Sequence, residues 1–270
     1  MNYKMIAIDL DDSLLGTDLM ISPKNKDALF KAIEQGVIVT IATGRMYISA
    51  LVYAKQLGLD VPLITYQGGL IKSALSEHIL YNKTVPIDIS RKIIEISKSR
   101  DAHLQIYIED DYYFEKRNEY SDAYHKNVGV AGKEVGSLDT FLTLAPNKLI
   151  IIQEPQRIIE LRDEFEKIFG EEIEINISKP QYLEFTHKEA TKGKALEHLA
   201  GLKGIDRDHI MAIGDSYNDI SMIKYAGLGV AMENAPDEVK KWADYITGTN
   251  DDDGVAKVIN KFVIEGDEDR

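Results

Sequence analysis

The chain has no cysteine, and it contains no long apolar stretch. Without cysteine, disulfide scaffolds, thiolate zinc sites and cysteine nucleophiles are excluded. No apolar run reaches the ~20 residues that a membrane span needs. The first residues, 1–6, lead directly into a strand-like run rather than a secretory signal. We therefore expect a cytoplasmic protein with no membrane partner.

Positive charge is also in short supply, since 32 Lys and Arg against 45 Asp and Glu give a formal net charge of −13. A nucleic-acid surface needs clustered Lys and Arg, so we expect no nucleic-acid partner. The glycine-rich motifs of nucleotide-binding loops are missing, as is the serine elbow of α/β-hydrolases. The apolar fraction is normal, 44% of 270 residues, which suffices for one large domain or two small ones. Nothing in the sequence indicates an oligomeric state.

Apolar strands alternate with amphipathic helices in the first third of the chain and again after residue 191. Strands that are apolar on both faces and separated by helices indicate a parallel sheet covered on both sides. The predicted fold class is therefore α/β, with a doubly wound parallel sheet. The first helix should begin at the capping Ser22 and Pro23. The expected strands are 5–8, 37–41, 62–65, 209–213 and 228–231, and the expected helices are 22–36, 46–57, 192–202, 218–225 and 254–263.

The pattern changes between about Thr84 and Thr186, where short segments alternate apolar and polar residues with a period of two. This alternation is typical of half-buried antiparallel strands. We interpret residues 84–186 as an inserted α+β domain with one exposed sheet face, and residues 1–83 and 187–270 as the core that it interrupts. The segments are strands 103–109, 172–177 and 182–185 and helices 88–98 and 155–169. Candidates for the exposed face are Tyr107, Tyr112, Tyr113 and Tyr182, although aromatic residues on a sheet more often pack.

Acidic residues follow two of the predicted strands directly. Asp9, Asp11 and Asp12 come after the first strand, and Asp215 and Asp219 come after the fourth. In a doubly wound sheet these strands are neighbours, and ligands bind at the point where the strand order reverses. Closely spaced carboxylates repel one another and need a cation or a shared proton. Oxygen-only ligands favour Mg²⁺, so two clusters predict a magnesium site, whereas a single Asp would more often be a turn former.

Further residues suit a phosphate group at the same edge of the sheet. Thr43, Gly44 and Arg45 follow the second strand, where a hydroxyl and main-chain N–H groups bind anions well. Lys192 opens the helix before the fourth strand, and its compact ammonium suits phosphate neutralisation. Asn218 is either a helix N-cap or a ligand contact, or both. Each of these residues alone has an ordinary structural explanation, as a turn, a solvated lysine or a cap.

Together these residues resemble the motifs of the haloacid dehalogenase superfamily, specifically its Cof-type sugar-phosphatase branch. The resemblance covers nearly the whole chain and implies a Rossmann-like core with an inserted α+β cap. Linkers near 84–86 and 186–188 would then act as hinges between the two. The four motifs, in order along the chain, are Asp9-Leu10-Asp11-Asp12-Ser13, Ala42-Thr43-Gly44-Arg45, Lys192, and Gly214-Asp215-Ser216-Tyr217-Asn218-Asp219.

The resemblance implies a Mg²⁺-dependent phosphatase that acts on small phosphomonoesters, sugar phosphates above all. Asp9 would be the nucleophile that forms a phosphoaspartate, and Asp11 the general acid and base. The metal would bind the Asp9 carboxylate, the main-chain carbonyl of Asp11 and Asp215, with Asp219 close behind. The phosphate and substrate contacts would come from Thr43, Gly44, Arg45, Lys192 and Asn218.

Two positions depart from the usual pattern of the branch. Asp12 stands where glycine is usual, and Gln67 stands where asparagine commonly follows the third strand. Alternative functions stay open: a phosphosugar mutase of the same superfamily, a receiver-like domain, or a catalytically silent phosphate-binding protein. A receiver carries its phosphoacceptor Asp after the third strand, and here that strand ends in Thr65-Tyr66-Gln67.

Overall fold

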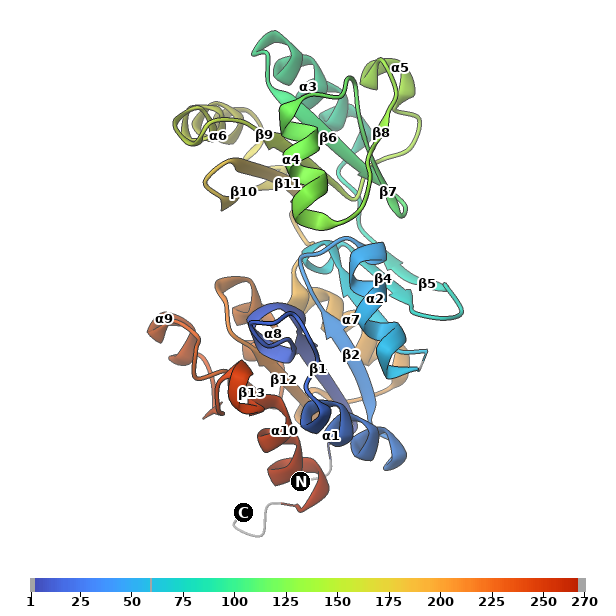
Figure 1. The fold of residues 1–270 in the computed structure, drawn as a ribbon, viewed down its shortest axis with the longest axis vertical. Coiled ribbons are helices and arrows are strands. Elements are labelled where there is room, and N and C mark those ends of the chain that lie inside the picture. Colours follow the sequence, from blue (N-terminus) through green and yellow to red (C-terminus); the bar gives the residue numbers. More distant parts are fainter. Residues whose placement is uncertain (1–2, 59, 267–270) are drawn as a thin grey trace. The chain divides into compact units, whose positions relative to one another are not determined.

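The computed structural model describes residues 3–58 and 60–266, and the chain divides into two compact units (Figure 1). The first unit, which we call the core unit, comprises Met1–Tyr81 and Thr191–Arg270. The second, the inserted unit, comprises Asn82–Ala190. These boundaries lie a few residues from the sequence-based ones, which were 83/84 and 186/187. In the described residues, no helix is both long and apolar enough to cross a bilayer.

An eight-stranded sheet forms the centre of the core unit. Its first six strands are parallel, and the seventh turns back to run antiparallel to the sixth, an edge that the sequence analysis did not predict. The sheet reads in order β14 (Tyr245–Ile246), β13 (Leu228–Ala231), β12 (Ile210–Gly214), β1 (Met5–Asp9), β2 (Ile38–Ala42), β3 (Pro62–Thr65), β4 (Leu70–Ser73) and β5 (Ile79–Asn82). β1 therefore lies between β2 and β12, as the doubly wound prediction requires, with Ile8 opposite Ile213.

Helices cover both faces of this sheet, so its central strands are buried and apolar (Figure 1). α7 (Lys192–Lys203) and α8 (Ile220–Tyr225) pack on one face through Leu196, Leu199 and Met222. α1 (Pro23–Glu34) packs against α10 (Gly254–Ile259) on the other face. α1 begins as predicted, because the Ser22 side chain accepts a hydrogen bond from the Asn25 N–H and Pro23 occupies the first turn. The remaining helices of the core unit are α2 (Tyr47–Leu57) and α9 (Asp237–Lys240).

The inserted unit has its own six-stranded sheet, antiparallel except for the pair β7–β8. It reads β10 (Ile173–Lys179), β11 (Tyr182–His187), β9 (Lys148–Ile152), β6 (His103–Ile108), β7 (Asp111–Phe114) and β8 (Lys133–Glu134). Its helices are α3 (Ile87–Ser99), α4 (Glu119–Val128), α5 (Leu138–Phe141) and α6 (Pro155–Phe169). The prediction located β6, β10, β11, α3 and α6, but it missed β9, although the run Lys148-Leu149-Ile150-Ile151-Ile152 is typical of a central strand.

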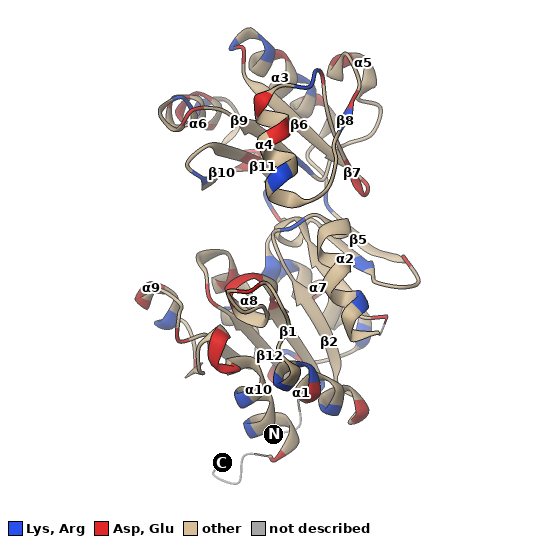
Figure 2. Ribbon diagram, in the orientation of Figure 1, with Lys and Arg blue, Asp and Glu red and all other residues tan. Residues whose placement is uncertain are grey.

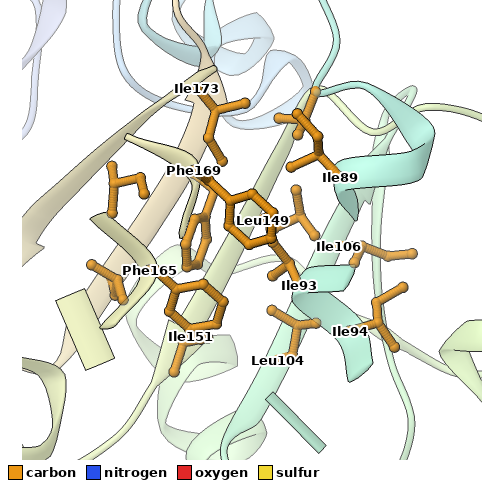
Figure 3. Packing of buried hydrophobic residues seen from close by; sticks show 14 of the residues in the cluster. Ile89, Ile93, Ile94, Leu104, Ile106, Leu149, Ile151, Phe165, Phe169 and Ile173 are labelled. Carbon is orange, nitrogen blue, oxygen red and sulfur yellow. The ribbon is translucent and has the colours of Figure 1, made fainter. Parts of the chain in front are cut away.

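One face of this second sheet forms an apolar core with α3, α5 and α6 (Figure 3). Phe165 lies at its centre, fully buried, with its ring 4.9 Å from that of Phe185 and 6.2 Å from that of Phe169. Alternate residues of β6 and β9, among them Ile106 and Ile151, complete the packing. The inserted unit thus has an apolar core of its own.

The opposite face of the sheet is covered over β6, β7, β9 and β11 and is exposed toward the end of β10, so the prediction of one exposed face was wrong for most of the sheet. α4 lies over it, and the ring of Tyr124 contacts the rings of Tyr107, Tyr112 and Tyr182 at 5.4–6.5 Å. Tyr107 and Tyr112 are fully buried, Tyr182 nearly so, and Tyr113 partly. α4 escaped prediction because its face toward the sheet is made of polar and aromatic residues rather than an aliphatic stripe.

The second predicted hinge was also misplaced. Thr186 lies inside β11 and pairs with Lys148, so it is held by a strand ladder rather than by a linker. Near the first predicted hinge, Val85 is buried in the inserted unit and donates its N–H to the Pro146 carbonyl at 2.8 Å. The two chain crossings between units lie outside these segments, at 81/82 and 190/191.

The central position of Phe165 yields a stability prediction. Phe165→Ala should destabilise the inserted unit by about 3–5 kcal/mol, because it removes a buried ring and leaves a cavity. Urea unfolding followed by circular dichroism measures this loss. The matched control is Ile168→Ala on the same helix, where the side chain is 47% exposed and the expected cost is below about 1 kcal/mol.

The single tryptophan, Trp242, lies in the core unit, so its fluorescence follows the unfolding of that unit. In Phe165→Ala, the urea midpoint followed by tryptophan fluorescence should therefore fall less than the midpoint followed by circular dichroism. Equal costs for Phe165→Ala and Ile168→Ala would contradict the packing described here.

Candidate active site

The loop after β1 carries the first acidic cluster. Asp9 ends the strand and is 5% exposed, and the chain then makes a kinked turn over Leu10–Leu14, closed by a hydrogen bond from the Leu15 N–H to the Leu10 carbonyl at 2.9 Å. Inside this turn Asp12 has φ +56°, in the left-handed region that favours glycine. The turn directs Ser13 back toward β12, where its hydroxyl donates to Asp215 Oδ1 at 2.9 Å.

The second cluster follows β12, next to β1 in the sheet. Asp219 is fully buried, and its Oδ2 accepts the N–H groups of Asp215 (3.0 Å) and Ser216 (2.9 Å). One ligand atom from each of Asp9, Asp215 and Asp219 lies within 4.8 Å of the other two. In Figure 2 the acidic ribbon at the α8 label belongs to the loop after β1, which is drawn dark blue in Figure 1. The adjacency of β1 and β12 therefore brings the two clusters together as predicted.

A buried lysine is held between these carboxylates. Lys192, in the first turn of α7, is 1% exposed, and its Nζ donates to both Asp9 Oδ1 and Asp219 Oδ1. The helix starts here because the Thr191 hydroxyl accepts the Lys194 N–H. Burial of an ammonium is costly unless it is paired with opposite charge. The two carboxylate contacts therefore offset the cost of burying Lys192.

The charges at this cluster do not balance. Burial raises the pKa of Asp9 well above its usual value, and the charge of Asp219 raises it further, while Lys192 opposes the shift. Burial, and next the charge of Asp219, raise the pKa of Asp215 to about 6. Burial alone would lower the pKa of Lys192, but the charges of Asp219 and Asp9 outweigh it and raise that pKa. The carboxylates therefore lack sufficient positive charge.

A divalent cation fits this deficit. When ionised, three carboxylates with one ammonium leave two negative charges, and the available donors are all oxygen, which suits Mg²⁺. Asp9 and Asp215 are the carboxylates best placed to bind it. Asp219 already accepts two N–H groups and contacts Lys192, so its position fits the predicted place behind the metal.

The loop after β2 brings Arg45 to Asp11. The Arg45 guanidinium forms a two-pronged ion pair with both carboxylate oxygens of Asp11, with Nε 2.8 Å from Oδ2. It also lies over the Tyr53 ring at 5.1 Å. Thr43 is buried, and its Oγ1 accepts the Arg45 N–H at 3.1 Å. The sequence suggested a substrate contact for Arg45, and it missed this pairing.

The loop after β3 fastens the remaining candidates. Asn218 donates from Nδ2 to Gln67 Oε1 at 2.9 Å. The Gln67 amide lies against Gly44, where an added Cβ would stand 2.4 Å from Gln67 Nε2. Gly44 must therefore remain glycine for Gln67 to lie there. Asn218 lies inside the 3₁₀ turn Tyr217–Asp219, whose N-cap is Ser216, so Asn218 is not the N-cap.

Thus the core unit alone brings together Asp9, Lys192, Asp215 and Asp219, pairs Asp11 with Arg45, and links Asn218 to Gln67. The sequence analysis assigned no contact to Ser13 or Tyr53. The hydroxyl in the first motif was a usable signal for Ser13, whereas Tyr53 carries no motif and its role depends on how α2 packs.

Known proteins resemble this chain over nearly its full length. Residues 6–259 match the family of haloacid dehalogenase-like hydrolases. A 5-amino-6-(5-phospho-D-ribitylamino)uracil phosphatase of Bacillus subtilis is 33% identical, over 97% of each chain. A crystal structure from Thermotoga maritima has 34% identity and a TM-score of 0.91, over 96% of this chain and 97% of that one.

A sugar phosphatase of haloacid dehalogenase subclass IIB is 25% identical with a TM-score of 0.79, over 96% of this chain and 98% of its own. The strand order, the inserted α+β unit and the four motifs agree with these similarities. The chain belongs to the haloacid dehalogenase superfamily, in its Cof-type branch, and is a phosphatase.

Proposed function

We propose that this phosphatase uses Mg²⁺ to hydrolyse small phosphomonoesters, sugar phosphates among them, through a phosphoaspartate on Asp9. The observation that carries the proposal is the cluster of Asp9, Asp215 and Asp219 within 4.8 Å, with the buried Lys192 ammonium between two of them. Such a cluster is suited to hold a cation and a phosphate together. The roles below follow from this placement and from the family resemblance.

The first step is attack of an Asp9 carboxylate oxygen on phosphorus. A bond forms between that oxygen and phosphorus, and the bond from phosphorus to the leaving oxygen breaks. Asp11 donates a proton to the leaving oxygen, so an alcohol departs rather than an alkoxide. Arg45 contacts both oxygens of the ionised Asp11 carboxylate and thereby fixes its direction. When Asp11 carries the proton that it donates, one oxygen holds that proton in place of an Arg45 contact, and the other oxygen still accepts from Arg45.

The second step regenerates the enzyme. Asp11, now ionised, takes a proton from water as the water oxygen attacks phosphorus, and the bond to Asp9 breaks. Inorganic phosphate leaves and the Asp9 carboxylate is restored. Mg²⁺ would be held by the Asp9 and Asp215 carboxylates and the Asp11 main-chain carbonyl, and it would supply charge neutralisation and alignment.

Three further residues bind the phosphoryl group in this proposal. Lys192 neutralises part of its charge from inside the core unit, and the Thr43 hydroxyl and the main chain at Gly44 supply hydrogen-bond donors. Asn218 contacts the substrate from its position beside Gln67. The inserted unit would act as the cap that excludes water and selects the leaving group, with hinges at the two chain crossings.

The names of two relatives support a substrate class. One is named a phosphatase of a phosphorylated ribitylaminouracil and another a sugar phosphatase. Both names describe a phosphate ester of a small polyhydroxylated group. We therefore propose small phosphorylated metabolites of this kind as substrates, and a cytoplasmic location stays a prediction from the sequence.

Metal dependence tests the proposal directly. Phosphate release from a panel of sugar phosphates should require Mg²⁺ and stop in excess chelator. Asp215→Ala should abolish Mg²⁺ binding in calorimetry, because it removes one of the two carboxylate ligands. The matched control is Asp27→Ala, an exposed acid paired with Lys31 on α1. Full turnover in excess chelator would contradict the metal-dependent function. Phosphate release only in the presence of a sugar bisphosphate activator would favour a phosphosugar mutase instead.

The affinity for Mg²⁺ should also depend on pH. With the pKa of Asp215 at about 6, roughly a tenth of this carboxyl is ionised at pH 5 and nearly all at pH 7.5. Because Mg²⁺ must displace the proton of Asp215, the apparent affinity for Mg²⁺ should be about tenfold weaker at pH 5 than at pH 7.5. Without metal, the folded protein binds this proton more tightly than the unfolded chain, so stability should fall as pH rises from about 4 to 6. Equal Mg²⁺ affinities at pH 5 and pH 7.5 would contradict the assignment of Asp215 as a ligand.

The two acids of the first motif should fail differently. Asp9→Asn removes the nucleophile, so turnover should fall by several orders of magnitude. Asp11→Asn removes only proton transfer, worth ~10²–10⁴-fold. With an aryl phosphate, whose phenol leaves without protonation, Asp11→Asn should release one phenol per enzyme and then stall. Rapid-mixing absorbance measures this burst, and a burst from Asp9→Asn would show that the nucleophile is wrongly assigned.

Arg45 should act through Asp11. Arg45→Lys keeps the charge but loses the planar fork, so Asp11 is no longer held by both oxygens. We expect kcat for an alkyl phosphate to fall ~100-fold, with KM little changed and a smaller loss for an aryl phosphate. Tyr53→Phe, which removes only the 3.4 Å contact from Arg45 Nη1, is the mild comparison. A rise in KM with kcat unchanged would instead make Arg45 a substrate contact.

A further inference from the structure

The main chain at Asp12 is strained, in the middle of the turn that carries the first motif. Its φ of +56° and ψ of +11° lie in the left-handed region, which glycine adopts freely and an Asp side chain adopts at some cost. Glycine is usual here in the branch that this chain resembles. The turn must therefore be held by contacts that outweigh the preference of Asp12 for other conformations.

An asparagine from another part of the core unit makes such a contact. Asn234, which follows β13, donates from Nδ2 to the Asp12 carbonyl at 2.8 Å. Its Oδ1 accepts the Asn250 N–H at 3.1 Å, which fixes the direction of the amide. Asn250 is buried, and its own Nδ2 donates to the Leu15 carbonyl at 3.0 Å. Two linked amides thus hold the turn at its middle and at its end.

The turn decides where its flanking side chains lie. Asp11, one residue before Asp12, reaches Arg45, and Ser13, one residue after, reaches Asp215. If Asp12 left the left-handed region, the peptide groups on both sides would rotate and both contacts would be displaced. The main-chain conformation of Asp12 therefore links three contacts: Asp11 with Arg45, Ser13 with Asp215, and the Asn234 amide with the Asp12 carbonyl.

We propose that Asn234 is a positioning residue, whose amide holds the left-handed main chain at Asp12 and thereby keeps Asp11 on Arg45 and Ser13 on Asp215. The effect on Mg²⁺ rests on the proposed function, since the main-chain carbonyl of Asp11 is one of the expected ligands. The restraint on the turn itself does not depend on any ligand. Asn234 matters more in this chain than it would beside a glycine at the same place in the turn.

A double-mutant cycle tests this dependence. The four proteins are the wild type, Asn234→Ala, Asp12→Gly and the double variant, melted in chelator. Asn234→Ala should lower Tm by about 3 °C when Asp12 is present. It should lower Tm by less than half as much in the Asp12→Gly background, because glycine keeps the left-handed conformation unaided. Asn176→Ala, an exposed asparagine of the inserted unit that donates to Glu174, is the matched control and should leave Tm unchanged.

Calorimetry with Mg²⁺ alone measures the consequence for the site. Asn234→Ala should weaken Mg²⁺ binding about tenfold with Asp12 present and about threefold or less in the Asp12→Gly background. Asn234→Asp separates charge from positioning, since its added negative charge should attract Mg²⁺ while its lost donor should weaken the site. Asp12→Asn removes the charge of Asp12 but keeps a Cβ, which glycine lacks, so the dependence on Asn234 should remain larger in it than in Asp12→Gly.

The outcomes distinguish this proposal from the proposed function. Equal Tm losses from Asn234→Ala in both backgrounds, or no loss in either, would overturn the restraint. A wild type that binds no Mg²⁺ would overturn the metal site, while the melting cycle in chelator would still decide the role of Asn234. Tighter Mg²⁺ binding in Asn234→Asp together with unchanged binding in Asn234→Ala would show that only charge matters at this position, and would also overturn the proposal.

Discussion

The buried ammonium of Lys192 is the interaction on which the rest of the site depends. It contacts Asp9 and Asp219 in a place with almost no access to water, so neither the cation nor the two carboxylates would be stable there alone. The contact joins the start of α7 to the ends of β1 and β12. Any packing that displaced one of these three elements would leave a buried charge unpaired.

Close main-chain approaches make that contact possible. A Cβ at Gly68 would stand 2.2 Å from the Thr191 carbonyl, one at Gly193 2.4 Å from the Ser221 carbonyl, and one at Gly214 2.5 Å from Asp219. At all three places a larger residue would push α7 or the β12 loop away from Asp9. These glycines therefore keep the Lys192 ammonium close to the carboxylates of Asp9 and Asp219. Their attraction would weaken if the charges moved apart.

The sequence predicted those parts of the molecule whose signal is local. Buried strands, the Ser22 cap and the acidic residues after two strands follow from runs of a few residues, and the strand order then brings the two acidic clusters together. The pairing of Arg45 with Asp11 and the amide contacts of Asn234 were out of reach, because each joins distant loops and carries no periodic pattern. The sequence also did not predict that α4 covers the inserted sheet. The buried side chains of α4 are Ser121 and Tyr124, so the helix lacks the aliphatic stripe that would have revealed it.

Asp9 and Asp11 show how two residues of one type, two positions apart, come to differ. Asp9 ends a strand, faces Lys192 and is almost wholly buried, so its charge is governed by a fixed cation and by neighbouring carboxylates. The side chain of Asp11 is 44% exposed and is directed by Arg45 from another loop. A nucleophile benefits from a rigid, water-poor position, whereas a group that must both give and take a proton needs access to the leaving group and to water. The chain leaves the strand directly after Asp9, and the turn that begins at Leu10 places Asp11 in the second environment, as the different roles proposed for the two acids require.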